Sequence, residues 1–135
     1  MNKPAAFQLE DYFINKVRLN FETKNAQKID VNLIPKGTFD SKNSKYNLTL
    51  ELSLTDTENS KNELVYINCI GTFIFEDLSK GIPDFFYVNS IAILFPYLRA
   101  FLSTITTQSG IEPLVLPTYN LSALETPLRN NTINV

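Results

Sequence analysis

The sequence predicts an α+β fold, in which an antiparallel β-sheet is covered on one face by a long helix. Residues 46–55 and 64–75 read as long strands joined by the polar stretch DTENSKN, so they should pair as an antiparallel hairpin. Residues 89–110 then carry apolar side chains at helical spacing. The 135 residues, 44% of them hydrophobic, are enough for one domain over residues 1–135 with a packed core.

The strands differ in how their apolar residues are distributed. Residues 17–22 alternate apolar and polar, and residues 23–45 read as a long polar connection with a short extended piece around residues 29–33. Loops of this length tend to be functional. Residues 46–55 alternate throughout, whereas residues 64–75 carry apolar side chains on both faces. Either loops shield the second face of this last strand, or it forms a subunit interface or binding surface.

The helix is expected to carry two apolar rows. Asn89 or Ser90 should cap its start, and Gly110 should end it. Pro96 removes the hydrogen bond to the Ala92 carbonyl, so the helix either kinks just before the proline or begins its regular part there. We favour the kink, because the main row continues through the proline in register. The main row contains Ile91, Leu94, Phe95, Leu98, Leu102 and Ile105, and the second row contains Ile93, Tyr97 and Phe101.

The segment after the helix is expected to be extended. Pro113 and Pro117 hold it in that form, with Leu114 and Leu116 two residues apart on one side. Residues 120–124 then start a short helix, which a following proline and a polar tail keep brief. The last residues should fray.

The composition argues against most catalytic and nucleic-acid-binding functions. The chain contains no histidine, which is the commonest general base and metal ligand, and no glycine-rich phosphate loop. Its one cysteine, Cys69, lies in the apolar run YINCIGTF, where we expect a buried small hydrophobe rather than a nucleophile. The net charge of −2 without a basic stripe makes nucleic acid and anionic membranes poor partners. We expect no catalytic residue, no metal and no cofactor.

The sequence also bears on location. The first residues are too short and too charged for a signal peptide, and no apolar run approaches the roughly 20 residues that a membrane span needs. A single cysteine allows no intrachain disulfide, which fits a reducing compartment. We therefore expect a soluble cytoplasmic protein that does not insert into a membrane.

Four motifs in the C-terminal half resemble those of the SecB protein-export chaperones. They are ILFPYLR at residues 93–99, Gly110, PLVLP at residues 113–117 and NLSAL at residues 120–124. The upstream order also agrees, because one strand, a long connection and a hairpin precede the long helix. The resemblance covers residues 12–126. It implies a four-stranded antiparallel sheet with a long helix on one face and a short C-terminal helix.

The resemblance further implies an ATP-independent chaperone, a holdase. SecB proteins assemble as dimers of dimers and hold unfolded precursor proteins in apolar grooves for export through the Sec pathway. They pass these proteins to the motor SecA and use no cofactor. The implied partners are therefore unfolded polypeptides, other copies of the chain in a homotetramer, and SecA. The surplus apolar surface of the helix and the last strand fits subunit contacts and client grooves.

The candidate site residues fall on three surfaces. We expect Tyr97, Leu98 and Phe101 to face other subunits while the rest of the main row packs on the sheet, although both rows are apolar and the assignment could be reversed. Of the outer-face positions that are acidic in SecB proteins, Glu22 alone is still acidic here, so it is the candidate for a SecA contact. The client groove is expected to be lined by Ile34, Phe39, Phe73, Phe75, Leu114, Leu116 and Tyr119.

The chain also departs from the family. Arg18 and Tyr66 stand where SecB proteins carry acidic residues on the outer face of the sheet, and the acidic C-terminal tail typical of the family is missing. The alternative function is therefore a SecB-like chaperone dedicated to one client, such as an antitoxin of a toxin–antitoxin system.

Two further hypotheses assign the chain to other functional classes. A hot-dog-type acyl thioesterase would need Asp84 or Asn89 as its acid or base, although a cap or turn role suits both residues better. An inert structural subunit would bind no unfolded chain, which distinguishes it from a chaperone.

Overall fold

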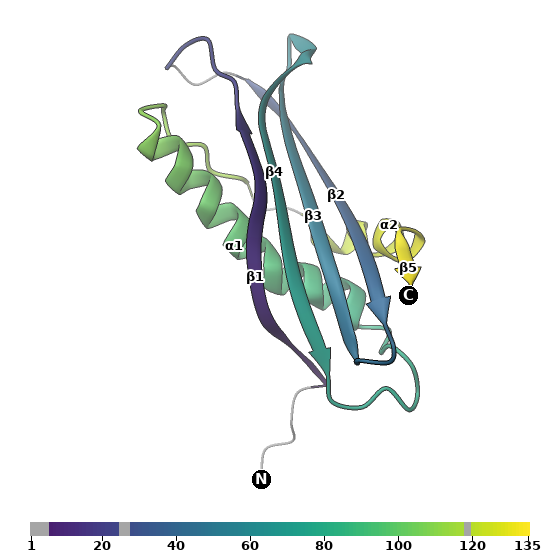
Figure 1. Cartoon of the computed structure of the whole chain (residues 1–135). Coiled ribbons are helices and arrows are strands. Elements are labelled where there is room, and N and C mark those ends of the chain that lie inside the picture. Colours follow the sequence, from purple (N-terminus) through teal and green to yellow (C-terminus); the bar gives the residue numbers. More distant parts are fainter. Residues whose placement is uncertain (1–5, 25–27, 118–119) are drawn as a thin grey trace.

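The computed structural model describes residues 6–24, 28–117 and 120–135 of the chain. One sheet forms a layer, and the long helix lies against one of its faces (Figure 1), which confirms the α+β class. In chain order the elements are β1 (Phe7–Leu19), β2 (Ile29–Asp40), β3 (Lys45–Asp56), β4 (Asn59–Phe75), α1 (Phe86–Gln108), the 3-10 turn η1 (Leu121–Leu124), α2 (Glu125–Asn130) and β5 (Thr132–Asn134).

The sheet has five strands in the order β1-β4-β3-β2-β5. The pairs β1–β4, β4–β3 and β3–β2 are antiparallel, whereas β5 runs parallel to β2. The expectation of four antiparallel strands is therefore corrected to a mixed sheet of five. β5 is only three residues long and lies in a polar tail. It is therefore too short to show the alternation of apolar and polar residues that predicts a strand. The preceding helix α2 brings it to the edge of β2 (Figure 1).

β1 begins at Phe7, earlier than the predicted start at residue 17. Its pairing with β4 shifts register between Leu9 and Asp11 and again between Ile14 and Lys16. Each such bulge inserts an extra residue and changes which residues face the core. The alternation that identifies a strand in a sequence is therefore lost over most of β1.

β2 occupies 12 residues within a segment predicted to be mostly loop. Pro35 and Gly37 suggested a turn, yet both are buried within the strand. The strand can contain Pro35 because β5 pairs with β2 only from Gly37 onward. The β2 edge is therefore unpaired at Pro35, and an unpaired edge does not need the backbone N–H that proline lacks. Gly37 fits because a Cβ atom there would overlap the hydroxyl group of Tyr46 on β3.

The core lies between the sheet and α1, which crosses the sheet obliquely (Figure 1). The predicted buried face of β3, from Tyr46 to Leu54, is confirmed, because alternate residues there have no exposed surface. Cys69 on β4 is also buried, as predicted. The helix packs closely on the sheet at Gly71, where a Cβ atom would lie 2.9 Å from Cδ1 of Leu94.

α1 starts at Phe86, before the predicted caps, and neither Asn89 nor Ser90 caps it. Pro96 lies inside the helix, so the regular part does not begin at the proline. The end is as predicted: Gly110 has a φ of 76°, and the Ile111 N–H donates to the Thr106 carbonyl at 3.1 Å. A glycine with positive φ and this hydrogen bond form a Schellman-type stop.

By length and composition alone, α1 could cross a membrane, although polar residues interrupt its apolar sequence. One face of the helix, however, is buried in the protein. Its fully buried side chains include Ile91, Leu94, Leu98 and Leu102 of the predicted main row, while Phe95 is 7% exposed and Ile105 is half-buried. The core helix of a protein can have the length and composition of a membrane span, and 33% of the most apolar stretch of α1 is buried within the chain.

Candidate functional site

The three phenylalanines predicted for a client groove lie in an aromatic cluster at the start of α1. Phe73 has no exposed surface and Phe75 is 7% exposed. Their ring centroids lie 5.6 and 4.9 Å from that of Phe86, the first residue of α1. Phe39 is half-buried, with its ring centroid 6.0 Å from that of Phe75. In the single chain this cluster fixes α1 on the sheet, and Phe73 and Phe75 have almost no surface to offer a client.

The other predicted groove residues lie apart from this cluster. Leu114 and Leu116 are 9% and 1% exposed, in an extended segment that α1 holds through Ser103 and Thr106. The Ser103 hydroxyl donates to the Leu114 carbonyl, and the Leu114 N–H donates to the Thr106 hydroxyl oxygen, both at 3.1 Å. Ile34 is 38% exposed on the opposite face of the sheet.

The structure therefore brings the described groove candidates to three places rather than into one groove. Tyr119 lies outside the described residues.

The predicted subunit face of α1 divides in the same way. Tyr97 is 43% exposed and Phe101 is half-buried, but Leu98 has no exposed surface. Leu98 is one residue from Tyr97 and therefore about 100° around the helix, on the side that packs against the sheet. Tyr97 and Phe101 have surface for a second subunit, and Leu98 does not.

A set of exposed apolar side chains lies on the β1 side of α1. We name it the tyrosine strip and define it by Tyr12, Phe85, Ile93 and Tyr97, which are 41%, 53%, 39% and 43% exposed. The ring centroids of Tyr12 and Tyr97 lie 4.4 Å apart. Phe85 and Ile93 line a hollow of about 420 Å³ with Ala6, Phe7, Asn89 and Ala92.

Beside the tyrosine strip, β1 pairs only with β4 among the described residues, so its other backbone edge is open. The sequence indicated only part of this surface. The second helical row already contained Ile93 and Tyr97. Tyr12 was not predicted, because the bulges of β1 break the alternation of apolar and polar residues by which its strand would be identified.

The outer face of the sheet carries carboxylates that already have partners within the chain. Glu51 accepts hydrogen bonds from Lys36 and from the Tyr66 hydroxyl, each at 2.6 Å. Glu63 pairs with Arg18 at 3.1 Å, and the Arg18 guanidinium lies 4.1 Å from the centre of the Tyr66 ring. The Lys36 bond, and next the Tyr66 bond, lower the pKa of Glu51. Both carboxylates are thus engaged within the chain.

Glu22, the predicted SecA contact, is placed differently from these residues. It is exposed in the segment after β1, not on a strand of the outer face. It lines a hollow of about 390 Å³ together with Leu19, Lys24 and Ile111 and their neighbours. The hollow lies where the loop after β1 meets the end of α1.

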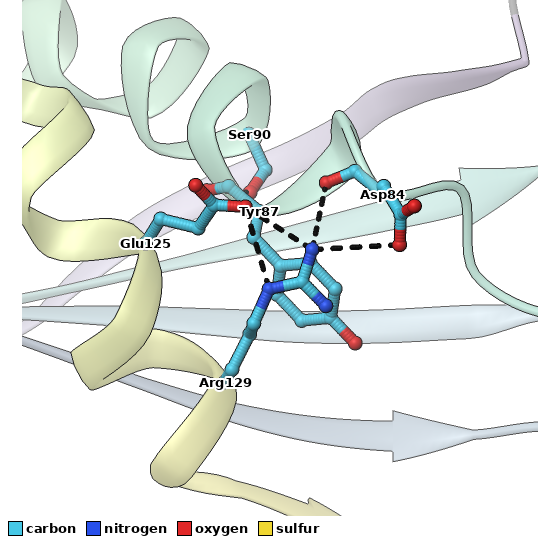
Figure 2. Close-up of polar contacts among 5 residues, drawn as sticks. All are labelled: Asp84, Tyr87, Ser90, Glu125 and Arg129. Carbon is cyan, nitrogen blue, oxygen red and sulfur yellow. Dashed lines mark hydrogen bonds and ion pairs between the residues drawn. The ribbon is translucent and has the colours of Figure 1, made fainter.

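Arg129 fastens α2 to the start of α1 (Figure 2). Its guanidinium lies 3.1 Å from a Glu125 oxygen, 3.2 Å from the Asp84 carbonyl oxygen and 3.5 Å from the Asp84 carboxylate. It also covers the face of the Tyr87 ring, 4.2 Å from the ring centre. The bond to Glu125 raises the pKa of Arg129. We name these four residues the arginine clamp; it positions α2 and therefore the strand that follows it.

The described residues contain one cysteine and no histidine. They contain no group of three or more Asp, Glu or Cys side chains that could hold a metal ion. Burial raises the pKa of Cys69 to about 11, so its thiol is protonated at neutral pH. Asp84 and Asn89, the thioesterase candidates, are exposed, and Asp84 belongs to the arginine clamp.

Sequence comparison identifies relatives over nearly the whole chain. The family described as "Preprotein translocase subunit SecB" matches residues 2–127. The protein-export protein SecB of Magnetococcus marinus is 27% identical over 126 residues, which cover 91% of this chain and 71% of that protein. An uncharacterized protein of Methanocaldococcus jannaschii is 41% identical over 51 residues, which cover 38% of this chain and 33% of that protein.

A solved structure shows the same fold. It is the SecB-like chaperone Rv1957 of Mycobacterium tuberculosis, in complex with a ChAD peptide from the HigA1 antitoxin. The TM-score is 0.68 at 15% identity, and the alignment covers 85% of this chain and 88% of that chain. The family match extends over both the sheet and α1, and it confirms the resemblance seen in the four sequence motifs. The chain therefore belongs to the SecB family.

Proposed function

We propose that the chain is an ATP-independent holdase that binds unfolded precursor proteins in the cytoplasm before their export through the Sec pathway. The observation that supports this function best is the exposure of large apolar side chains at both edges of the sheet. The tyrosine strip lies beside β1, and Ile34, Ile133 and Val135 lie at the β2 side, with 38%, 65% and 69% exposed. A chaperone needs such surfaces to assemble and to hold apolar segments.

The tyrosine strip is the proposed subunit contact. It lies beside the open edge of β1, so a second copy can pair with the strand and cover Tyr97 and Phe101 at once. We propose a homotetramer, a dimer of dimers, in which this surface forms one of the two kinds of subunit contact. Leu98 has no part in it, because the residue is buried within its own chain.

Client binding is proposed to depend on apolar burial without strict sequence readout. Burial contributes about 25 cal/mol per Å² irrespective of residue order, which favours promiscuity. An extended client adds main-chain hydrogen bonds at a sheet edge. Among the predicted groove residues, Ile34 and Phe39 retain accessible surface for this role.

Suppression of aggregation tests the function. A model protein is diluted from denaturant with and without the chain, and light scattering is followed in the absence of ATP. A holdase delays scattering at a stoichiometric ratio. If scattering rises equally fast with the chain in excess, the chain is not a general holdase.

The second candidate, a chaperone dedicated to one client such as an antitoxin, is favoured by the outer face of the sheet. Arg18 and Lys36 neutralise Glu63 and Glu51 there, so a basic SecA segment would find no free carboxylate in this pair of sites. Calorimetry with SecA separates the two functions. Export predicts measurable SecA binding, whereas a dedicated chaperone predicts none, together with a tight complex with a single partner.

A further inference from the structure

β5 is a feature of this chain beyond the part that matches its family. The family match ends at residue 127, whereas β5 covers Thr132–Asn134. It lies against the β2 edge at Gly37–Phe39, where it extends the sheet in parallel orientation. The end of the chain thus occupies an edge that would otherwise be open to another strand.

The contact is made by the backbone and by short polar side chains. The Gly37 N–H donates to the Asn131 carbonyl at 3.1 Å, and the Val135 N–H donates to the Phe39 carbonyl at 2.9 Å. The Asn131 side-chain amide donates to the Pro35 carbonyl at 3.2 Å. Any extended chain can reproduce the two backbone bonds, since they require no particular side chain.

One side-chain contact gives this edge a chemical preference. The Tyr46 hydroxyl of β3 lies 2.6 Å from the Thr132 hydroxyl, across the position of Gly37 on β2. Thr132 donates its own proton to the Leu128 carbonyl at 2.7 Å, so Tyr46 donates to Thr132. Because Gly37 has no side chain, Tyr46 can reach the edge of the sheet beneath it. The edge therefore presents a donor to whichever strand lies there.

β5 fills this place poorly. Ile133 and Val135 are 65% and 69% exposed. Ile133 lines a hollow of about 450 Å³ with residues of β2, β3 and the end of α2, among them Lys36, Thr38 and Thr49. α2 is held more firmly, by the fully buried Leu128 and by the contacts of Arg129 with Asp84 and Tyr87. β5 can therefore leave the edge by local opening while α2 stays in place.

We propose that the β2 edge at Gly37–Phe39 is a strand-docking site for client polypeptides and that β5 is its internal competitor. The site takes an extended segment parallel to β2, with serine or threonine over Gly37 and an aliphatic residue directly after it. The hydroxyl accepts from Tyr46, and the aliphatic side chain enters the hollow that Ile133 only partly fills. This inference rests on the proposed chaperone function and names where and how a client binds.

A reversible disulfide tests the competition. Thr38 and Ile133 are paired neighbours in parallel strands, close enough for a disulfide when both are changed to cysteine. The variant Thr38→Cys with Ile133→Cys is compared with itself, oxidised by diamide and then reduced by dithiothreitol. The probe is fluorescent, reduced and carboxymethylated α-lactalbumin. The single variants are controls, and Cys69 is buried away from both positions.

The locked form should bind the probe at least about tenfold more weakly than the same protein after reduction, since β5 can no longer leave. Equal binding by the oxidised and reduced forms overturns the inference and leaves the chaperone function intact. Absence of binding by the wild type as well contradicts the chaperone function itself.

A second measurement tests the hydroxyl preference without a disulfide. Labelled peptides with the sequence of residues 129–135 carry either Thr or Val at position 132. The Thr peptide should bind about fivefold more tightly to the wild-type chain, a ratio expected for one net hydrogen bond. Tyr46→Phe should remove this difference, and equal binding of the two peptides to the wild type overturns the preference.

Discussion

The rings of Tyr12 and Tyr97 stack across the boundary between β1 and α1, with centroids 4.4 Å apart and an interplanar angle of 35°. Both side chains are more than two-fifths exposed, at 41% and 43%. A contact that joins the strand to the helix therefore also faces outward. Such a pair offers a second copy a rigid, largely apolar surface at low cost in side-chain entropy.

Tyr97→Lys should split the assembly while leaving each subunit folded. Tyr97 lies at the surface of the single chain, so the fold loses little, but a lysine there would be buried without a partner between copies. Size-exclusion chromatography with light scattering at micromolar concentration should show the wild type as a tetramer and the variant as a smaller species. Ser60→Lys, at the exposed start of β4, is the matched control and should remain tetrameric. An unchanged mass for Tyr97→Lys would place the subunit contact elsewhere.

Gly37→Ala should lower the free energy of unfolding by about 1–3 kcal/mol, the usual cost of forcing an extra group into a packed site. The added Cβ overlaps the Tyr46 hydroxyl, whose ring has no room to move in the core. Urea denaturation of Gly37→Ala, Tyr46→Phe and the double variant measures the coupling. The double variant should be more stable than the sum of the single effects predicts. Strict additivity would show that the two residues do not compete for space.

Arg129→Ala should loosen the C-terminal segment and leave the hairpin of β3 and β4 unchanged. The arginine clamp connects α2 to Asp84 and Tyr87, and β5 depends on α2 for its position. Amide hydrogen exchange should therefore quicken in residues 120–135 but not in residues 45–75. Equal protection of α2 and β5 in the wild type and the variant would show that the clamp has no such role.

Stability should fall above pH 9. Burial raises the pKa of Cys69 from 9.0 to about 11 and that of Tyr46 from 10.0 to about 12. The unfolded chain therefore loses these protons first, and the free energy of unfolding decreases as pH rises from 9 to 12, by about 2 kcal/mol for each group. Urea denaturation at pH 8 and pH 11 measures the loss. Cys69→Ala should show a smaller loss than the wild type, and an equal loss would contradict the assignment to Cys69.

The sequence predicts those strands and helices in which the spacing of apolar residues matches the face that is buried. β3 alternates because one face of it is buried against α1, and the main row of α1 is continuous because the helix lies on the sheet. The bulges in β1 break the alternation, which is why its first ten residues and Tyr12 were missed. In β2, Pro35 and Gly37 indicate a turn by local preference, yet tertiary packing makes them part of a strand.

The site residues were harder to predict, for a related reason. Phe39, Phe73 and Phe75 are large and apolar, and sequence alone does not distinguish an aromatic core from an aromatic groove. Nothing local marks β5 either, because three polar and apolar residues in a tail acquire their pairing only after α2 has been placed. Ile93 and Tyr97 could be identified because helical spacing separated them from the buried row.

Binding of an unfolded chain is the most direct test of the proposed holdase function. Fluorescence anisotropy compares labelled, reduced and carboxymethylated α-lactalbumin with the native, disulfide-bonded form of the same protein, without ATP. A holdase should show saturable binding of the unfolded form, no binding of the native form, and no change when ATP is added. Failure to bind the unfolded form, or equal binding of both forms, would contradict it.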